Sequence, residues 1–394
     1  MFSSRLPGHF VRNSVALAVE RCHAGGIPLV DLTESNPTRA GFDYPSTLLE
    51  PLARPEALVY EPCALGLPVA RAAVAGDFAR RSVPIPPERT VITASTSEAY
   101  SLLFKLLCDP GDVVLAPRPS YPLVEHLTRL DDVHVEPYDL EYQGAWSVDL
   151  GGLTRAIAFN GAASRIRAVI LVSPNNPTGS CVTTGELRSM ASLCRAHGLA
   201  LIGDEVFADY PLDDDGCAPA SVLAQDDALT FGLGGLSKSV GLPQVKFGWI
   251  GVNGPDGLVR QALDRLELIC DTYLSVATPV QMAAPALMAA GAAVRAQIVE
   301  RVRRNYRVLK AEADAHPSCR VLPAEAGWYA VVRVPATRSE EAIVLELIER
   351  ERVLVHPGYF FDFPREAFLV VSLLPEPDVF RTAAARMLRL VAAA

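Results

Sequence analysis

The segment Gly234-Gly235-Leu236-Ser237-Lys238-Ser239-Val240-Gly241-Leu242-Pro243 places one lysine among small residues, directly after the apolar run 229–233. A lysine side chain normally stays in water, because burying an unpaired ammonium is costly. Glycine and serine neighbours leave room for another group to approach the amine closely. These residues alone leave two interpretations open: a solvated loop lysine, or a lysine that forms a Schiff base with a carbonyl cofactor.

The chain around this segment alternates short apolar strands with helices. Expected strands are 91–94, 112–116, 133–136, 168–172, 199–202, 228–233 and 248–252, and expected helices are 69–81, 97–107, 121–129 and 184–197. This alternation predicts an α/β fold with a mainly parallel sheet that helices cover on both faces. Ligands of such sheets bind beyond the carboxyl ends of the strands.

After residue 257 the pattern changes to longer helices and shorter strands. Expected helices are 258–273, 280–310, 339–350 and 377–391, and expected strands are 321–322, 328–334, 353–355 and 368–372. The change predicts a second, smaller α+β domain. We therefore divide the chain into an N-terminal arm (1–35), a large α/β domain (36–280) and a small α+β domain (281–394) that the arm joins.

Two polar motifs follow expected strands. Ser-Pro-Asn-Asn-Pro-Thr-Gly occupies 173–179, and Asp204 begins the sequence Asp-Glu-Val-Phe. A plain turn and a helix cap are the structural alternatives. A metal ligand is a third interpretation of the acid, but no His or Cys stands at ligand spacing. An amide in the turn can donate to a phenolic oxygen, and a buried carboxylate needs a positive partner such as a protonated pyridine nitrogen.

Three further features stand near strand ends. Ser95, Thr96 and Ser97 open an expected helix, where hydroxyls and free amides bind an anion or simply cap the helix. Lys246, eight positions after Lys238, can add positive charge to the same anion. Tyr121 can stack on a flat heterocycle or lie on the surface. Together the lysine, acid, amide, anion site and aromatic ring match the needs of pyridoxal 5'-phosphate.

Composition limits the other possibilities. The 394 residues are 50% hydrophobic and 21% charged, with a formal charge of -9. No Lys/Arg-dense run suggests a nucleic-acid or membrane partner. The eight cysteines are scattered, and the first residues lack an apolar signal core, so we expect a cytoplasmic protein. The apolar stretch 283–294 is shorter than the roughly 20 residues of a membrane span and is expected to be a buried helix.

In motif order and spacing, residues 36–372 resemble the class I/II aminotransferases, which are fold type I pyridoxal-phosphate enzymes with a seven-stranded sheet. The resemblance implies that Lys238 forms the Schiff base and shuttles a proton. It implies that Asp204 holds the pyridine nitrogen protonated and that Asn176 donates to the phenolic oxygen. The implied phosphate site consists of Ser95, Thr96, Ser97, Gly235 and Lys246. Tyr121 would cover the cofactor, and Tyr60 would reach the phosphate of a neighbouring subunit in a homodimer.

The sequence departs from the family pattern at four positions. Phe207 replaces a tyrosine, which removes one donor to the phenolic oxygen; Gly235 lacks a frequent hydroxyl; and Lys246 replaces an arginine. Val370 stands where the family usually carries the arginine that binds the substrate carboxylate. Either another residue takes over, with Arg39, Arg118 and Arg333 as candidates, or the amino substrate is atypical. Asn36 and Arg39 complete the expected substrate side.

The function that the resemblance implies is transamination from an amino acid or amine to an oxo acid, by a ping-pong mechanism. A β-lyase or a decarboxylase on the same fold is the alternative, because the cofactor supplies the chemistry in each case. A ligand sensor of this fold is disfavoured, since no basic helix-turn-helix module precedes the motifs and both Lys238 and Asp204 are present.

Overall fold

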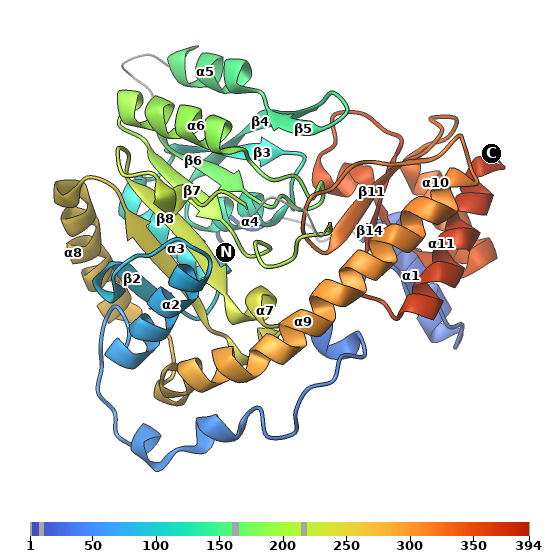
Figure 1. The fold of residues 1–394 in the computed structure, drawn as a ribbon. Coiled ribbons are helices and arrows are strands. Elements are labelled where there is room, and N and C mark those ends of the chain that lie inside the picture. The colour runs from blue at the N-terminus through green and yellow to red at the C-terminus, as the bar shows by residue number, and fades with distance from the viewer. Residues whose placement is uncertain (1, 8–11, 160–164, 214–218, 394) are drawn as a thin grey trace.

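This computed structural model describes residues 2–7, 12–159, 165–213 and 219–393. Figure 1 shows a large sheet wrapped by helices on one side of the molecule and a smaller sheet on the other. The long helix α9 (Thr278–Asp314) runs from beside the first sheet to beside the second. One helix therefore packs against both parts of the fold.

Within the described residues the large sheet has eight strands, in the spatial order β2-β9-β8-β7-β6-β3-β4-β5. Their bounds are β2 (Thr90–Thr93), β3 (Val113–Arg118), β4 (His134–Tyr142), β5 (Trp146–Val148), β6 (Ile166–Val172), β7 (Ala200–Asp204), β8 (Thr230–Gly235) and β9 (Gly248–Asn253). The strands β8, β7, β6, β3 and β4 pair in parallel. Because β9 is antiparallel to both β8 and β2, strands β2, β3, β6, β7 and β8 end at the edge where β9 begins.

Two helical layers cover the large sheet. The helices α3 (Thr96–Leu107), α4 (Leu123–Leu130) and α8 (Asp256–Tyr273) pack on one face, through side chains such as Leu103 and Leu266. The helices α2 (Pro68–Arg80), α5 (Leu150–Phe159), α6 (Thr184–His197) and α9 pack on the other, through side chains such as Met190 and Leu287. Burial on both faces explains why the central strands are continuously apolar. The predicted α/β class is confirmed.

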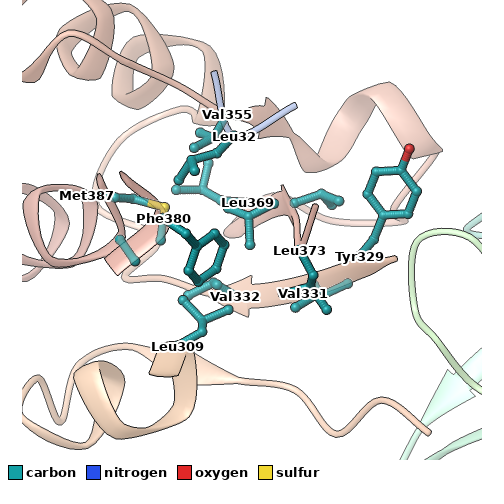
Figure 2. Close-up of a cluster of buried hydrophobic side chains, with 14 of the residues drawn as sticks. Leu32, Leu309, Tyr329, Val331, Val332, Val355, Leu369, Leu373, Phe380 and Met387 are labelled. Carbon is teal, nitrogen blue, oxygen red and sulfur yellow. The ribbon is translucent and has the colours of Figure 1, made fainter. Parts of the chain in front are cut away.

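The small sheet contains β10 (Arg320–Val321), β11 (Tyr329–Arg333), β14 (Phe368–Ser372) and β13 (His356–Pro357), paired antiparallel in that order. Figure 2 shows Val332 and Leu369 of this sheet packed with Leu309 of α9 and with Phe380 and Met387. Phe380 and Met387 belong to the last helix, α11 (Pro377–Ala392). One face of the small sheet thus packs against α9 and α11, and side chains of the other face, such as Val331, are buried in the same hydrophobic cluster.

The N-terminal segment lies against the C-terminal part of the chain. After α1 (Ser14–Ala24), strand β1 (Val30–Asp31) pairs in parallel with β12 (Val353–Leu354). The predicted boundary at 280/281 falls in the first turn of α9, so this helix crosses it. The division into domains stays a prediction.

The structure adds elements that the sequence did not reveal. β4 continues to Tyr142 instead of ending at 136, because it forms a hairpin with β5, an eighth strand beyond the expected seven. Helix α5 was not expected. α4 begins at Leu123 instead of 121, since the helical conformation is disfavoured before Pro122. α10 (Glu340–Glu346) gives way to a π-helical turn (Leu347–Glu351) inside the expected helix 339–350.

Among the described residues, α9 is the one helix long and apolar enough to cross a membrane by length and composition. The expectation that stretch 283–294 is too short to span rested on an apolar run inside what is a 37-residue helix. Leu287, Val294, Ile298 and Val302 are buried against the rest of the fold, and a core helix passes the same test. Its length therefore does not distinguish a membrane-spanning helix from a buried core helix.

Candidate active site

The sheet edge where five strands end gathers the polar motifs. Ser95 follows β2, Asn176 follows β6, Asp204 ends β7 and Lys238 follows β8. The turn after β6 lies against its neighbour β7, because Ser173 N–H donates to the Asp204 carbonyl at 3.0 Å. The sequence predicted one shared edge because it predicted a parallel sheet, and the strands that carry the motifs do run in the same direction.

Lys238 lies in α7 (Leu236–Ser239), a four-residue helix that starts at the end of β8. Its Nζ is 4.6 Å from the ring centroid of Trp328 and 5.6 Å from that of Phe207. Burial lowers the Lys238 pKa to about 8, although the Asp204 carboxylate acts in the opposite direction. The amine is therefore neutral in a larger fraction of molecules near neutral pH than an ordinary lysine, which favours a nucleophile or a proton acceptor.

Asp204 is held by two hydrogen bonds at the end of β7. Tyr100 of α3 donates its hydroxyl to Oδ2 at 3.1 Å, and Val206 N–H donates to Oδ1 at 3.3 Å. Burial raises the Asp204 pKa to about 6, while these bonds and the Lys238 charge lower it. A cationic partner would lower it further, since an opposite charge favours the carboxylate. The site suits a positively charged ring nitrogen.

The two asparagines of the turn 173–179 have different surroundings. Asn175 Nδ2 donates to the Pro119 carbonyl at 3.3 Å, and its Oδ1 accepts from the Thr178 amide and hydroxyl. Asn175 therefore shapes the turn. Asn176, which precedes a cis peptide bond to Pro177, has a buried Oδ1 with no hydrogen-bond partner among the described residues. Unlike that of Asn175, its carboxamide oxygen is not used by the turn.

The start of α3 and two glycines form a narrow cradle. Gly235 pairs with Gly248, and a Cβ on Gly248 would lie 2.9 Å from the Ser95 carbonyl carbon. A Cβ on Gly235 would lie 3.1 Å from the Phe247 carbonyl oxygen. Ser95 Oγ accepts from the Glu98 amide at 3.2 Å, so it caps the helix, as the structural alternative proposed. Thr96 and Ser97 carry first-turn amides, which have no intrahelical partner. Lys246 is exposed just before β9.

The aromatic residues separate into two groups. Phe207 is buried beside Lys238, with its ring centroid 5.4 Å from Trp328. Tyr121 is 46% exposed, and its ring centroid lies 6.3 Å from that of Phe361. Tyr60 is 68% exposed and lines a different cavity, together with Tyr273 and Gln281. Within this single chain, Tyr60 is thus placed at the surface.

Val370 lies on the face of the small sheet opposite that of Leu369, because side chains alternate along a strand, and it is fully buried in the same hydrophobic cluster. Its cross-strand partners are Val331 and His356. Burial lowers the pKa of His356 to about 4, so this imidazole is uncharged at neutral pH. Neither cross-strand neighbour of Val370 carries a positive charge.

The other predicted substrate residues have defined places. Asn36 Oδ1 accepts from the Thr38 amide and hydroxyl, so its side chain closes a turn. Arg118 donates from Nε and Nη2 to Asp139. Arg39 and Arg333 are exposed and make no side-chain ion pair with residues in the described ranges. The structure provides no arginine in contact with Val370 among these candidates.

Several residues at the site were not predicted from the sequence. Tyr100 on α3 and Trp328 before β11 contact Asp204 and Lys238. Tyr210 donates a short hydrogen bond to the Lys238 carbonyl. An aromatic residue on a helix or in a loop is usually part of the packing, so no signal short of the fold marked them. The described residues contain no cluster of three or more His, Cys, Asp or Glu side chains that could hold a metal ion.

Residues 52–386 match the family described as "Aminotransferase class I and II". This chain belongs to the class I and II aminotransferases. It is 25% identical to glutamate-pyruvate aminotransferase AlaA of Escherichia coli, over 93% of this chain and 91% of that protein. It is 32% identical to S-alkyl-thiohydroximate lyase SUR1 of Arabidopsis thaliana, over 56% and 47%. A solved structure of alanine aminotransferase from Pyrococcus furiosus has the same fold, with a TM-score of 0.89, 21% identity and full coverage of both chains.

Aminotransferases of this family use pyridoxal 5'-phosphate, so both the predicted enzyme class and the predicted cofactor are confirmed. The residues at the sheet edge fit this group. The Asn176 carboxamide, whose buried oxygen has no partner among the described residues, the glycine cradle beside Ser95 and the buried Lys238–Asp204 pair offer polar contact, space and charge where the cofactor needs them. Binding, orientation and electrostatics are what a protein supplies to such a cofactor.

Proposed function

We propose that this aminotransferase moves an amino group from an amino acid or amine to an oxo acid, with Lys238 as the residue that carries pyridoxal 5'-phosphate and transfers the proton. The observation that supports it most is the position of Lys238. Its amine is buried between two aromatic rings and beside Asp204, and its pKa is lowered to about 8. A structural lysine has no need of such surroundings.

Bound pyridoxal 5'-phosphate supplies an aldehyde and an electron-accepting ring. In the proposed mechanism, Lys238 Nζ accepts a proton from the substrate carbon and returns it as a general acid. Asp204 keeps a proton on the ring nitrogen, and Tyr100 orients the Asp204 carboxylate. Asn176 donates to the phenolic oxygen, without the second donor that a tyrosine at position 207 would give. Donor and acceptor use the site in turn, which gives ping-pong kinetics.

The proposed phosphate site consists of the first turn of α3 and the cradle beside it, with Ser95, Thr96, Ser97 and Gly235 around the phosphate. Free amides at a helix N-terminus attract an anion. Lys246 contributes a point charge from the start of β9, and Tyr121 closes the site at the end of β3. These assignments are tested by cofactor affinity in the corresponding alanine variants, or for Gly235 in Gly235→Val.

We propose a homodimer in which Tyr60 reaches the neighbouring subunit's site. Leu58 is 89% exposed and Tyr60 is 68% exposed, and Tyr273, which is also exposed, lines the same cavity as Tyr60. Large exposed apolar side chains on one surface favour association. The scattered cysteines and the acidic charge support a cytoplasmic location.

Relatives named for alanine and for glutamate-pyruvate transfer make alanine, glutamate and pyruvate the first substrates to test. These substrates carry a carboxylate, and Val370 stands where the family usually has the arginine that binds it. We propose that specificity is therefore atypical, with Arg39, an exposed cation three residues after Asn36, as the candidate for the substrate carboxylate.

The partial similarity to a lyase favours one second candidate, a β-lyase or decarboxylase on the same cofactor. One experiment separates the candidates. Purified protein loaded with pyridoxal 5'-phosphate is mixed with amino acids and amines, with and without oxo acids. Conversion of the cofactor to its aminated form, reversed by an oxo acid, is the expected result. Release of ammonia or carbon dioxide without any oxo acid would select the second candidate.

A further inference from the structure

The short helix that carries Lys238 has few bonds of its own. α7 spans four residues, and two of the contacts that close it, Val240 N–H to the Leu236 carbonyl and Gly241 N–H to the Lys238 carbonyl, are 3.4 Å long. The Leu236 carbonyl also accepts from Leu242 N–H at 2.8 Å, which leaves the Lys238 and Ser239 carbonyls without a backbone bond of normal length among the described residues. Helices this short are not stable by themselves, and the last carbonyls of any helix lack intrahelical partners. Other parts of the chain must therefore fix this segment.

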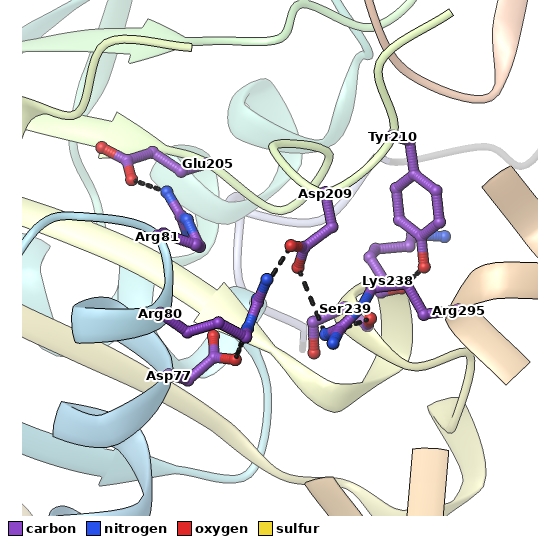
Figure 3. Close-up of polar contacts among 9 residues, drawn as sticks. All are labelled: Asp77, Arg80, Arg81, Glu205, Asp209, Tyr210, Lys238, Ser239 and Arg295. Atoms are coloured by element: carbon purple, nitrogen blue, oxygen red, sulfur yellow. Dashed lines mark hydrogen bonds and ion pairs between the residues drawn. The ribbon is translucent and has the colours of Figure 1, made fainter. Parts of the chain in front are cut away.

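Three side chains from distant parts of the sequence donate to these carbonyls. The Tyr210 hydroxyl donates to the Lys238 carbonyl, and Arg295 Nη1 of α9 donates to the Ser239 carbonyl at 3.5 Å. The Tyr44 hydroxyl donates to the Gly241 carbonyl at 2.7 Å. Figure 3 shows Tyr210 and Arg295 approaching Lys238 and Ser239 from different elements. Side chains from elsewhere in the chain thus bind three carbonyls at the end of α7 and just after it.

The donors are themselves restrained. Tyr210 is fully buried, with its ring 5.1 Å from that of Trp328, and burial raises its pKa, so the hydroxyl keeps its proton. Asp209 lies 3.8 Å from Arg295 and 2.8 Å from Arg80, so one carboxylate links α9 to α2. Figure 3 shows this chain of charges ending beside Ser239.

We propose that Tyr210, Arg295 and Tyr44 are positioning residues that hold the Lys238 backbone so that its amine stays between Trp328 and Phe207. Tyr210 restrains both the backbone and the side chain of Lys238. Its hydroxyl donates to the Lys238 carbonyl, and its ring packs on the Trp328 ring that contacts Nζ. The consequence for catalysis rests on the function proposed for Lys238. The positioning itself is a property of the chain and can be measured without turnover.

The test is the Lys238 pKa in the full-length chain freed of cofactor. It is read from the pH dependence of reductive methylation with isotope-labelled formaldehyde, followed by NMR. Tyr210→Phe removes only the hydroxyl and keeps the ring on Trp328. The amine should then sample wetter positions, and its pKa should rise by about one unit toward its ordinary value. Asp204 is the charged group that acts on Lys238, and it is unchanged in this variant.

Tyr138→Phe is the matched control, because Tyr138 is buried and donates to a strand carbonyl, that of Ile170, at 2.9 Å. It should leave the Lys238 pKa unchanged. Tyr44→Phe should raise that pKa by a smaller amount, and it decides the question if Tyr210→Phe does not fold. An unchanged pKa in folded Tyr210→Phe and Tyr44→Phe overturns the proposal, as does an equal shift in Tyr138→Phe. A protein that fails to transaminate leaves this measurement intact.

Discussion

The strand ends of the large sheet and the buried surroundings of Val370 in the small sheet differ in chemical character. At the edge, Lys238, Asp204 and Asn176 are polar groups that the fold buries or leaves without a protein partner. On the small sheet, Val370 is fully buried between a valine and an uncharged histidine. The first region matches the family motifs, and the second departs from them.

This difference separates two demands on an aminotransferase. Cofactor chemistry needs an amine, an acid and an amide in fixed places. Burying such groups costs free energy, so buried groups with shifted pKa values are common at functional sites. Substrate recognition needs only a surface that fits the substrate. We therefore propose that the apolar Val370 changes specificity within a retained chemistry.

The largest effect is expected at the edge. Lys238→Ala should lower kcat by at least about 10⁴-fold, because it removes both the covalent attachment and the proton transfer. Steady-state turnover measures it. Lys310→Ala is the control, since Lys310 Nζ also lies over an aromatic ring, 4.5 Å from the Tyr306 centroid. Comparable losses in both variants would contradict the role of Lys238.

A smaller loss is expected for Asp204→Asn. An amide cannot keep a proton on the ring nitrogen, so kcat should fall about 10²–10³-fold, the size typical of losing one preorganised electrostatic contact. Asp131→Asn is the control, because Asp131 is a mostly buried carboxylate paired with Lys105. Full activity in Asp204→Asn would remove this carboxylate from the mechanism.

The cofactor-free protein should gain stability when the buried amine is replaced. The Lys238 pKa of about 8 lies below its ordinary 10.5, so between these values the unfolded chain binds more protons and the free energy of unfolding rises with pH. Lys238→Met should therefore be more stable by about 1–3 kcal/mol near neutral pH, and the advantage should shrink as the pH rises from about 8 to about 10.5. Urea unfolding across this range measures it; a pH-independent difference would be inconsistent with a depressed lysine pKa.

The smallest effect is expected on the small sheet. Val370→Arg adds a carboxylate anchor, so KM for an α-amino acid should fall about tenfold with little change in kcat. Substrate saturation curves measure it. Val370→Met adds volume without charge and should not lower KM. If both variants behave alike, position 370 does not face the substrate carboxylate.

Most of the fold could be read from the chain because its local signals agree with its tertiary structure. Helix α6 has the predicted bounds, since the Thr183–Glu186 capping box starts it and Gly198, in a left-handed conformation, ends it. Strand β5 and the extension of β4 were missed because they stabilise one another in a hairpin, and neither has a strong pattern alone. Which strands pair depends on tertiary contacts that the local sequence does not show.

Some residues of the candidate site were predicted from the sequence, and others became apparent only in the structure. Lys238, Asp204 and Asn176 were found because each lies in a motif at a strand end. Tyr100, Trp328 and Tyr210 were not, because each acts through a contact with a residue far away in the sequence. The structure also distinguished Asn175, which shapes the turn, from Asn176, which has no protein partner for its buried oxygen.

The sequence by itself determined the alternation of strands and helices and the edge at which the motifs meet, and it singled out Lys238 as the proposed reactive amine. These follow from periodicity and from residues that are neighbours in the chain. Only the tertiary structure decided how deeply Lys238 is buried, what holds its backbone and what surrounds Val370. Desolvation and hydrogen bonding depend on which distant segments come into contact, and short-range sequence patterns do not contain that information.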